Sequence, residues 1–463
     1  MTTETPVFDR RDFDARLKEF VAAEGLPGAA AGIVLGAELA WSGSAGCADL
    51  ATRQPASEET LYRIASITKT VTGTAIMGLR DAGRLDLDDS AVEYLPELRE
   101  AVNPFAPIEA ISLRQLLSHE SGLRFEPAGT DWSASRYQGD PRVSLANPHD
   151  IVFRTPPFAQ HKYSDLAYQL LGEIVTRVSG TPYPEYVRES ILDPLGMSST
   201  AFDPLPPALS ARCATGYGWR GLSDELGAVS PLAPVWAEGG LWSSVADLGK
   251  WVSFQLSAYR PTEPADPAVL QARTLREMHK PRYLADDAWT SAWGISWCAA
   301  RRDNVTWIHH GGGLPGFTST VCFDPRKQVG AVVIMNGTTG VTELALALAA
   351  QARALVAEPE PEITAPEPVP EQYRPLLGVY SRQGLGGWLF RLEWRAGTLA
   401  FVPAESPGFR LGLMPTSDPE VFTMEPGTNF AGEQVIFRRN GRGEVTSVLL
   451  VETALVRLAP LAG

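Results

Sequence analysis

The sequence predicts an α+β protein in which one antiparallel sheet is flanked by helices and followed by a separate all-β region. Strand-like runs lie at both ends of the first 356 residues with helical segments between them, and the tail holds only short strand-like runs. A chain of 463 residues also exceeds what one hydrophobic core usually supports. We therefore expect a main domain over residues 1–356, a linker over 357–371 and a small antiparallel barrel over 372–463.

The first part of the chain is expected to contain one helix and two adjacent strands. Asp9–Ala23 has apolar residues on one helical face and should pack on a core. Two strand-like runs follow, Gly28–Leu35 and Glu38–Ala45, and Gly36-Ala37 joins them. The helices expected after them cover residues 66–80, Ser112–Leu117, 165–179 and Ala246–Leu256.

The predicted sheet is completed near the end of the main domain. Asp324-Pro325-Arg326-Lys327 predicts the turn of a hairpin, and Leu344–Leu355 is a helix that should cover one sheet face. Because strands lie at both ends of this domain, its N- and C-terminal segments should share one antiparallel sheet. The late strands are expected at Gly294–Ala300, Val305–His309, Thr318–Phe323 and Gly330–Met335.

The linker and the tail differ in composition from the main domain. Between Glu358 and Glu371, ten of 14 residues are Pro or Glu, so this stretch should be extended and stiff. The spacing of the runs beyond it predicts a small antiparallel barrel or sandwich. These runs are Trp388–Trp394, Thr398–Val402, Val421–Glu425, Val435–Arg439 and Val445–Val451.

Composition and charge exclude several classes of protein. Hydrophobic residues make up 44% and charged residues 20%, as in ordinary globular proteins. A net charge of −14 disfavours a nucleic-acid partner or an anionic membrane surface. The N-terminus shows no apolar signal segment and no stretch is apolar enough to span a membrane, so we expect a cytoplasmic location. The four cysteines form no disulfide pattern and should be buried thiols.

The strongest chemical feature is Ser66-Ile67-Thr68-Lys69, at the start of a predicted helix. Residues i and i+3 share a helix face, so Lys69 should lie beside Ser66. A serine hydroxyl needs a neighbouring base to become a nucleophile, and a lysine can be that base if burial lowers its pKa. The same four residues also fit an ordinary surface helix, but Lys69 is one of only six lysines in the chain.

A second feature, Tyr163-Ser164-Asp165, precedes the helix predicted over residues 165–179. A tyrosine near a cationic lysine can have a lowered pKa and relay protons. The alternative is a helix N-cap, in which Ser164 or Asp165 caps and Tyr163 packs against the helix.

A third feature is the run of glycines that follows His310 on a predicted strand. Such a strand lets a substrate backbone approach closely, and the N–H of Gly313 is a candidate oxyanion donor. The alternative is a tight turn with a hydrogen-bonded histidine. None of the six histidines stands in a metal-binding H-E-x-x-H motif, so no metal is expected.

In this order and spacing, the three features resemble the motifs of the serine β-lactamase and penicillin-binding-protein superfamily. More narrowly they resemble its class C-like branch, which includes D-aminopeptidases, D-alanyl carboxypeptidases and β-lactamase-like esterases. Three more segments are similar to runs of that branch: Leu116–Leu123, Glu238–Leu248 and Trp293–Trp297. The resemblance covers about residues 9–356 and implies a β-lactamase/transpeptidase-like fold with an all-helical subdomain.

The resemblance also implies a role for each motif residue. Ser66 would be the acylated nucleophile, Lys69 would assist proton transfer, and Tyr163 would activate Ser66 or protonate the leaving group. His310-Gly311-Gly312 matches the His-x-Gly form of the third motif, and the N–H groups of Ser66 and Gly313 would form the oxyanion hole. The reaction would be a two-step acyl transfer without a cofactor or a metal.

Asp165 departs from the pattern of that branch, which has asparagine there. An ionised aspartate cannot donate to a substrate amide carbonyl, and it would raise the pKa of Lys69 if it were close. We expect Asp165 either to pair with Lys69 or to accept from a substrate amine or hydroxyl.

Other residues near these motifs have less specific expectations. His119 lies in a segment that is structural in the resembled family, so it should be a buried hydrogen-bonding residue, and His309 should face away from the site. Two irregular stretches, 124–162 and 213–238, should wall the pocket. Their aromatic residues include Trp132, Tyr137, Phe158, Tyr217, Trp219 and Trp236.

The sequence therefore predicts a serine hydrolase that cleaves an amide or ester bond in a small molecule or short peptide, such as a D-amino-acid amide. The alternatives are a β-lactamase and a non-catalytic binding or regulatory protein that retains the fold. The tail is expected to approach the active site or to form a homo-oligomer, or else to be an independent module.

Overall fold

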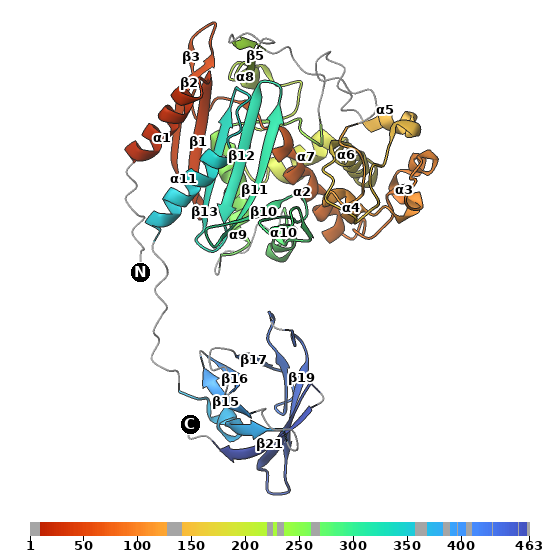
Figure 1. Cartoon of the computed structure of the whole chain (residues 1–463), viewed down its shortest axis with the longest axis vertical. Coiled ribbons are helices and arrows are strands. Elements are labelled where there is room, and N and C mark those ends of the chain that lie inside the picture. Colours follow the sequence, from red (N-terminus) through yellow and green to blue (C-terminus); the bar gives the residue numbers. More distant parts are fainter. Residues whose placement is uncertain are drawn as a thin grey trace. The chain divides into compact units, whose positions relative to one another are not determined.

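The computed structural model has two compact units, Met1–Glu358 and Pro359–Gly463 (Figure 1). The predicted linker lies outside the described residues up to position 367, so its extent stays a prediction. The structure describes residues 10–126, 141–219, 226–228, 236–260, 269–356, 368–382, 389–395, 397–403, 410–427, 429–451 and 453–460.

The first unit is built on an antiparallel sheet. Its strands are β1 (Gly28–Leu35), β2 (Glu38–Asp49), β3 (Gln54–Pro55), β8 (Tyr283–Leu284), β9 (Ser291–Trp293), β10 (Cys298–Arg302), β11 (Val305–Leu314), β12 (Phe317–Asp324) and β13 (Val329–Met335). They lie in the order β3-β2-β1-β13-β12-β11-β10-β9-β8. Ala31 of β1 lies opposite Gly43 of β2 on one side and Val333 of β13 on the other. The prediction that N- and C-terminal segments share one sheet is confirmed.

Helices cover both faces of this sheet. α1 (Arg10–Ala23) and α11 (Thr342–Leu355) pack on one face (Figure 1). α9 (Val245–Ser257), whose N-cap is Ser244, packs on the opposite face. Because side chains alternate along a strand and both faces are covered, β1 and β13 are buried almost throughout, which explains their continuous apolar sequences.

The remaining helices of the first unit surround a second part of its core. They are α2 (Thr68–Asp81), α3 (Ala91–Tyr94), α4 (Leu113–Leu117), α5 (Pro141–Ala146), α6 (Asp165–Ser179), α7 (Tyr183–Val187), α8 (Pro207–Ser210) and α10 (Ala272–His279). Short strand pairs β4 (Tyr62–Arg63) with β7 (Trp242–Ser243), and β5 (Tyr217–Trp219) with β6 (Leu226–Ala228), connect to them. The helix predicted from residue 66 begins as a 3-10 turn, η1 (Ala65–Ile67), which leads directly into α2.

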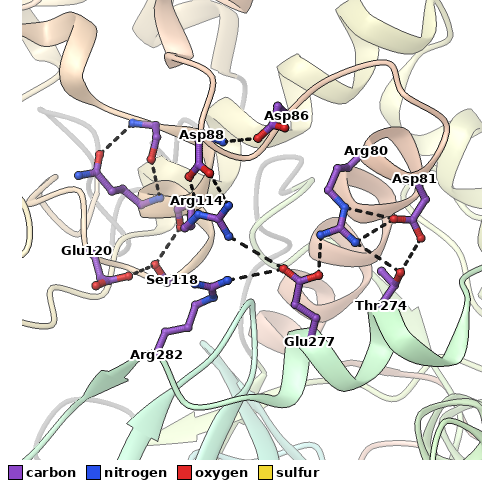
Figure 2. A network of polar contacts seen from close by, with 12 residues as sticks. Arg80, Asp81, Asp86, Asp88, Arg114, Ser118, Glu120, Thr274, Glu277 and Arg282 are labelled. Carbon is purple, nitrogen blue, oxygen red and sulfur yellow. Dashed lines mark hydrogen bonds and ion pairs between the residues drawn. The ribbon is translucent and has the colours of Figure 1, made fainter. Parts of the chain in front are cut away.

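A polar network joins α2, α4 and α10 (Figure 2). Glu277 of α10 accepts from Arg80 of α2 at 2.6 Å, and it also faces Arg282 at 3.6 Å. Arg114 of α4 makes two hydrogen bonds to Asp88, of 2.6 and 2.7 Å. Paired, planar contacts of this kind fix orientation, so the network holds the far end of α2 against its neighbours.

One predicted strand is only partly correct. Of the expected run Gly294–Ala300, residues 298–300 belong to β10, whereas residues 294–297 form the hairpin loop between β9 and β10, with Trp293 paired to Cys298. Gly294 N–H donates to Trp297 O at 2.8 Å, and Ser296 has φ of 61°. A side chain at Gly294 would lie 2.3 Å from Met278 O, so close backbone packing requires the turn and the glycine.

The second unit is a closed antiparallel barrel, as predicted. Its strands are β14 (Gly378–Ser381), β15 (Leu389–Arg395), β16 (Thr398–Pro403), β17 (Leu411–Pro415), β18 (Val421–Met424), β19 (Gln434–Arg439), β20 (Val445–Leu450) and β21 (Thr453–Pro460). Each strand pairs with the next, and β14 pairs with β21 to close the ring. Sequence reading missed β14, β17 and β21. Buried Tyr380, Phe401, Phe422 and Phe437 belong to one core cluster of this unit.

Two further expectations concern the whole chain. The four cysteines are unpaired, but only Cys298 and Cys322 are buried, while Cys47 and Cys213 are partly exposed. Within the described ranges, no helix is both long and apolar enough to cross a membrane.

Candidate active site

Ser66 lies in η1, immediately before α2. Ala65, the residue before it, has φ of 48°, in the left-handed region that L-residues rarely adopt. Ala65 and Ile67 are buried, whereas Ser66 is partly exposed. The strained turn therefore presents the Ser66 side chain at the surface of an otherwise buried segment.

Strands β11 and β12 hold this turn from the sheet side. Ser319 Oγ of β12 donates to Ile64 O at 2.7 Å. A Cβ atom at Gly312 of β11 would lie 2.2 Å from the same oxygen, whereas a Cβ at Gly313 would meet nothing within 4 Å. Gly312 is thus required for packing against the turn, and Gly313 faces open space.

These two glycines provide a matched prediction. Gly312→Ala should destabilise the fold by about 1–3 kcal/mol and reduce any Ser66-dependent activity, because the methyl group would push β11 away from Ile64. Gly313→Ala should leave stability within about 0.5 kcal/mol, since its site is exposed and open. Urea unfolding of both variants tests this, and equal losses would contradict the packing role of Gly312.

The Lys69 ammonium group is fully buried and faces three oxygen atoms. Its Nζ lies 3.1 Å from Ser66 Oγ, 2.6 Å from Glu238 O and 2.6 Å from Asp165 Oδ1. An ammonium group has three N–H donors, so its donors match these three acceptors in number. The predicted neighbourhood of Lys69 and Ser66 is present, and so is the ion pair between Lys69 and Asp165.

The charge state of Lys69 differs from the first expectation. Burial by itself lowers the pKa of Lys69, but the carboxylate of Asp165, together with Tyr163 and Glu238, outweighs burial and raises the pKa above its ordinary value. The pKa of Lys69 is therefore not lowered, and the group is an ammonium ion at neutral pH. The prediction that a nearby Asp165 would raise the pKa of Lys69 is confirmed.

Tyr163 lies against the same two residues. Its side chain interacts with Ser66 and Lys69, and Lys69 Nζ lies 5.1 Å from its ring centroid. Burial raises the pKa of Tyr163, and the opposing effect of Lys69 is smaller. The expectation of a lowered pKa is therefore wrong, and Tyr163 is a neutral phenol that can donate a proton.

The N-cap interpretation of the Tyr163-Ser164-Asp165 run is confirmed, and a role of Tyr163 in proton transfer stays a prediction. Ser164 is the N-cap of α6, with its Oγ accepting from Ala167 N–H at 3.1 Å. Its backbone N–H donates to His119 Nδ1 at 3.1 Å. The buried His119 ring also stacks on Tyr163, with centroids 4.1 Å apart. The cap thus orients Tyr163 and Asp165, and the hydrogen-bonding role expected for His119 is present.

His310 is buried on the same side of the sheet. Its Nδ1 lies 2.6 Å from Gly311 O, which makes Nδ1 the protonated nitrogen and Nε2 an acceptor. Burial and nearby Lys69 lower the pKa of His310 to about 3, so the ring is neutral. His309 instead interacts electrostatically with Arg302 and Glu343, as expected for the other face.

An aromatic cluster extends the site beyond the predicted residues. Trp293 of β9 meets His310 and His119 edge to face, with centroids 5.4 and 5.1 Å apart, and stacks on His161 at 5.1 Å. Phe125, which is 44% exposed, lies 5.8 Å from the Tyr163 ring. Phe125 and His161 belong to the stretch 124–162 that was expected to wall the pocket, and Trp293 is the last residue of β9.

Several of the aromatic residues expected at the pocket do not lie there or are not described. Tyr217 is buried, and its hydroxyl accepts from Leu50 N–H at 2.8 Å. Trp132 and Tyr137 lie outside the described residues, as does the side chain of Trp219. Phe158 is 59% exposed. Trp236 packs instead with Arg142, whose guanidinium carbon is 5.6 Å from the ring.

Sequence reading missed two buried carboxyl groups, Glu126 and Glu238. Both interact electrostatically with Lys69, and Glu126 also with Asp165. No motif marks Glu126, because it follows Phe125 in an irregular segment; Glu238 stood in a segment recognised only for its resemblance. Among the described residues, no group of three His, Cys, Asp or Glu side chains is arranged to hold a metal ion.

Comparison with known proteins identifies the family. The family model described as Beta-lactamase matches residues 13–356. The chain belongs to the beta-lactamase family. Among curated members, protein flp of Staphylococcus aureus strain COL is 28% identical over 314 residues, which are 67% of this chain and 60% of flp. This chain thus spans only 60% of the length of that relative.

Several solved structures share the fold. An octameric penicillin-binding protein homologue from Pyrococcus abyssi has a TM-score of 0.64 at 22% identity, covering 97% of this chain and all of that one. A D-stereospecific amidohydrolase from Streptomyces sp. has a TM-score of 0.59 at 23% identity, over 72% and 95% of the two chains. A class C beta lactamase from Rhodobacter sphaeroides has a TM-score of 0.59 at 22% identity, and the match covers 74% of this chain and 98% of that one. The predicted β-lactamase/transpeptidase-like fold is confirmed.

Proposed function

We propose that this beta-lactamase family member is a serine hydrolase that forms an acyl-enzyme on Ser66. The observation that carries the proposal is the contact of Lys69 Nζ with Ser66 Oγ at 3.1 Å, beside the ring of Tyr163, whose centroid lies 5.1 Å from the same Nζ. A serine with a buried amine and a phenol at its hydroxyl has the groups that nucleophilic attack and leaving-group protonation require.

Each residue has a distinct role in this reaction. Ser66 Oγ attacks the substrate carbonyl carbon while its proton passes to Lys69, which has first given a proton to Asp165 Oδ1, 2.6 Å away. The N–H groups of Ser66 and Gly313 stabilise the oxyanion. Tyr163, a neutral phenol, protonates the leaving group and takes a proton from Lys69 in return, and Asp165 gives its proton back to Lys69. His310 positions the strand that carries Gly313. Water then releases the acid and restores Ser66.

We propose amides and esters of small molecules or short peptides, including D-amino-acid amides and carboxylic esters, as the substrate class. The fold shared with a solved D-stereospecific amidohydrolase supports an amide substrate. Asp165 in place of a neutral amide donor favours a substrate that offers a donor, such as an amine, over one that offers only a carbonyl. Amide and ester hydrolysis would use the same acyl-enzyme.

A fluorophosphonate probe tests the proposed nucleophile directly. Wild-type protein should take one label, and Ser66→Ala should take none. A panel of p-nitrophenyl esters, D- and L-amino-acid amides and nitrocefin then ranks the substrates, with nitrocefin reporting β-lactamase activity. Absence of labelling in folded wild-type protein would favour a binding or regulatory protein that retains the fold.

Asp165→Asn should change the pH dependence of turnover. Without the carboxylate, burial dominates and the pKa of Lys69 falls, so a larger fraction of Lys69 is neutral and able to accept the Ser66 proton. In the pH profile of kcat/KM, the limb that reports the ionisation of Lys69 should move to lower pH by about one to three pH units. A pH profile on the best panel substrate measures it, and an unmoved limb would mean that Asp165 does not control Lys69.

We also propose that the full chain self-associates. The solved homologue from Pyrococcus abyssi is octameric, and its match to this chain covers 97% of the residues. Light scattering of the full chain and of a chain ending at residue 357 would compare their masses. Equal, monomeric masses would contradict a role of the barrel in assembly.

A further inference from the structure

The carboxyl group of Glu126 lies in an unusual environment beside Asp165. The residue is only 7% exposed, and both of its carboxyl oxygens are buried without a hydrogen-bond donor among the described residues. A buried carboxylate without donors is costly, so most buried carboxylates accept several hydrogen bonds. The state of Glu126 must therefore be explained by its neighbours.

Backbone contacts fix Glu126 at the start of α6. Phe125 O accepts from Asp165 N–H at 2.8 Å and from Leu166 N–H at 3.2 Å. Ser164 Oγ donates to Arg124 O at 2.7 Å. The chain from Arg124 to Glu126 thus runs along the N-cap of α6, and the buried carboxyl groups of Glu126 and Asp165 interact electrostatically with each other. Two carboxyl groups can share a hydrogen bond only if one of them is protonated.

A count of the charges around Lys69 leads to the same requirement. Burial lowers the pKa values of His119 and His310, so both are neutral, and Tyr163 is a phenol. Glu238, on the segment before β7, accepts from Gln169 Nε2 at 3.1 Å. Three ionised carboxylates would then face the single ammonium ion of Lys69. Like charges that share a buried site resist joint ionisation, so one carboxyl group keeps a proton.

We propose that Glu126 is a positioning residue for the reaction proposed above, with a protonated carboxyl group that donates a hydrogen bond to the carboxylate of Asp165. The two acids then carry one negative charge opposite one ammonium ion. The bond also orients Asp165, whose Oδ1 faces Lys69 Nζ at 2.6 Å. When Ser66 attacks, one proton moves from Lys69 to Asp165 and another from Ser66 to Lys69. Tyr163 then protonates the leaving group and is reprotonated by Lys69, which recovers its own proton from Asp165.

The electrostatics of Glu126 agree with this geometry. Burial and the neighbouring Asp165 raise the pKa of Glu126 to about 10, and Lys69 opposes them only in part. Glu126 therefore keeps its proton throughout the neutral range and loses it only in alkaline solution.

Infrared difference spectroscopy tests the proton without any turnover. In the full chain carrying Ser66→Ala, a protonated carboxyl group should give a carbonyl band at neutral pH that disappears above about pH 10, the pKa given for this group. Glu126→Gln in the same background should remove the band. Glu120→Gln is the matched control, because Glu120 is equally buried but accepts from Ser118 Oγ. A band that survives Glu126→Gln, or no band at all, would overturn the proposal.

Kinetics test the positioning role separately. Glu126→Leu removes the donor and should lower kcat/KM by about tenfold or more, the value of one hydrogen bond to a charged group. Glu126→Gln keeps an N–H donor toward Asp165 and should recover most of this loss, while the alkaline limb near pH 10 disappears from its profile. Equal losses of kcat/KM in both variants would show that Glu126 has only a structural role. Failure of Ser66 to react would instead affect the proposed function and leave the infrared result unchanged.

Discussion

Ser66→Ala is expected to lower kcat by about 10⁴- to 10⁶-fold, the usual cost of removing the nucleophile from a group of residues that act together. The fold should survive, because the Ser66 side chain is partly exposed and its hydroxyl accepts from Lys69 Nζ, which keeps its contacts with Asp165 and Glu238 O. Steady-state kinetics on the best panel substrate measure the effect, and urea unfolding confirms that the variant is folded.

Ser112→Ala is a suitable control for a lost serine hydroxyl. Ser112 forms a capping box with Gln115 at the start of α4, far along the chain from the proposed chemistry. Its loss should cost about 1 kcal/mol of stability and leave kcat unchanged. If Ser66→Ala kept a tenth of the wild-type activity, the nucleophile would have to be another residue.

Lys69→Met should have the largest effect on stability of any substitution at the site, about 3–5 kcal/mol, because it removes one partner of a buried ion pair. Asp165 would remain 6% exposed, with its counter-ion lost and Glu126 beside it. Turnover should be abolished as well, since no other amine contacts Ser66 Oγ within the described part of the chain. Chemical denaturation gives the stability change.

The double variant Lys69→Met with Asp165→Asn separates stability from chemistry. A neutral amide has no charge to compensate, so most of the lost stability should return while turnover stays absent. The two substitutions should therefore be non-additive by about 1–3 kcal/mol, as residues in direct contact usually are. Additive losses would show that the 2.6 Å contact between Lys69 and Asp165 contributes little.

Local sequence patterns predicted the long helices, many of the strands, the pairing of Ser66 with Lys69 and the N-cap of α6. The spacing of Ser66 and Lys69 along a helix start places them together in any helix, and Ser164 before α6 is an N-cap in any context. The alternation and turns of β11, β12 and β13 are likewise local properties. These predictions needed no knowledge of which distant segments meet.

Other features depend on contacts between segments far apart in the chain. Gly294 to Trp297 form a turn because β9 and β10 pair and Gly294 packs on Met278 O, which no local pattern reveals. Strands β14 and β21, which sequence reading missed, pair with β15 and β20 and also with each other, a contact between the two ends of this unit that closes the barrel. Trp293 joins the site because the sheet brings β9 beside β11 through β10.

The sequence by itself determined which chemical groups the site contains and their order along the chain: a serine and lysine on one turn, a tyrosine with an aspartate, and a histidine before glycines. Only the tertiary structure decided their protonation. Lys69 holds its charge because Asp165 lies 2.6 Å away, and Tyr163 stays neutral because burial exceeds the influence of that charge. Glu126 belongs to the site only because the fold brings its side chain beside Asp165. Protonation depends on burial and on the distance to other charges, and both quantities arise from packing between segments that the sequence separates.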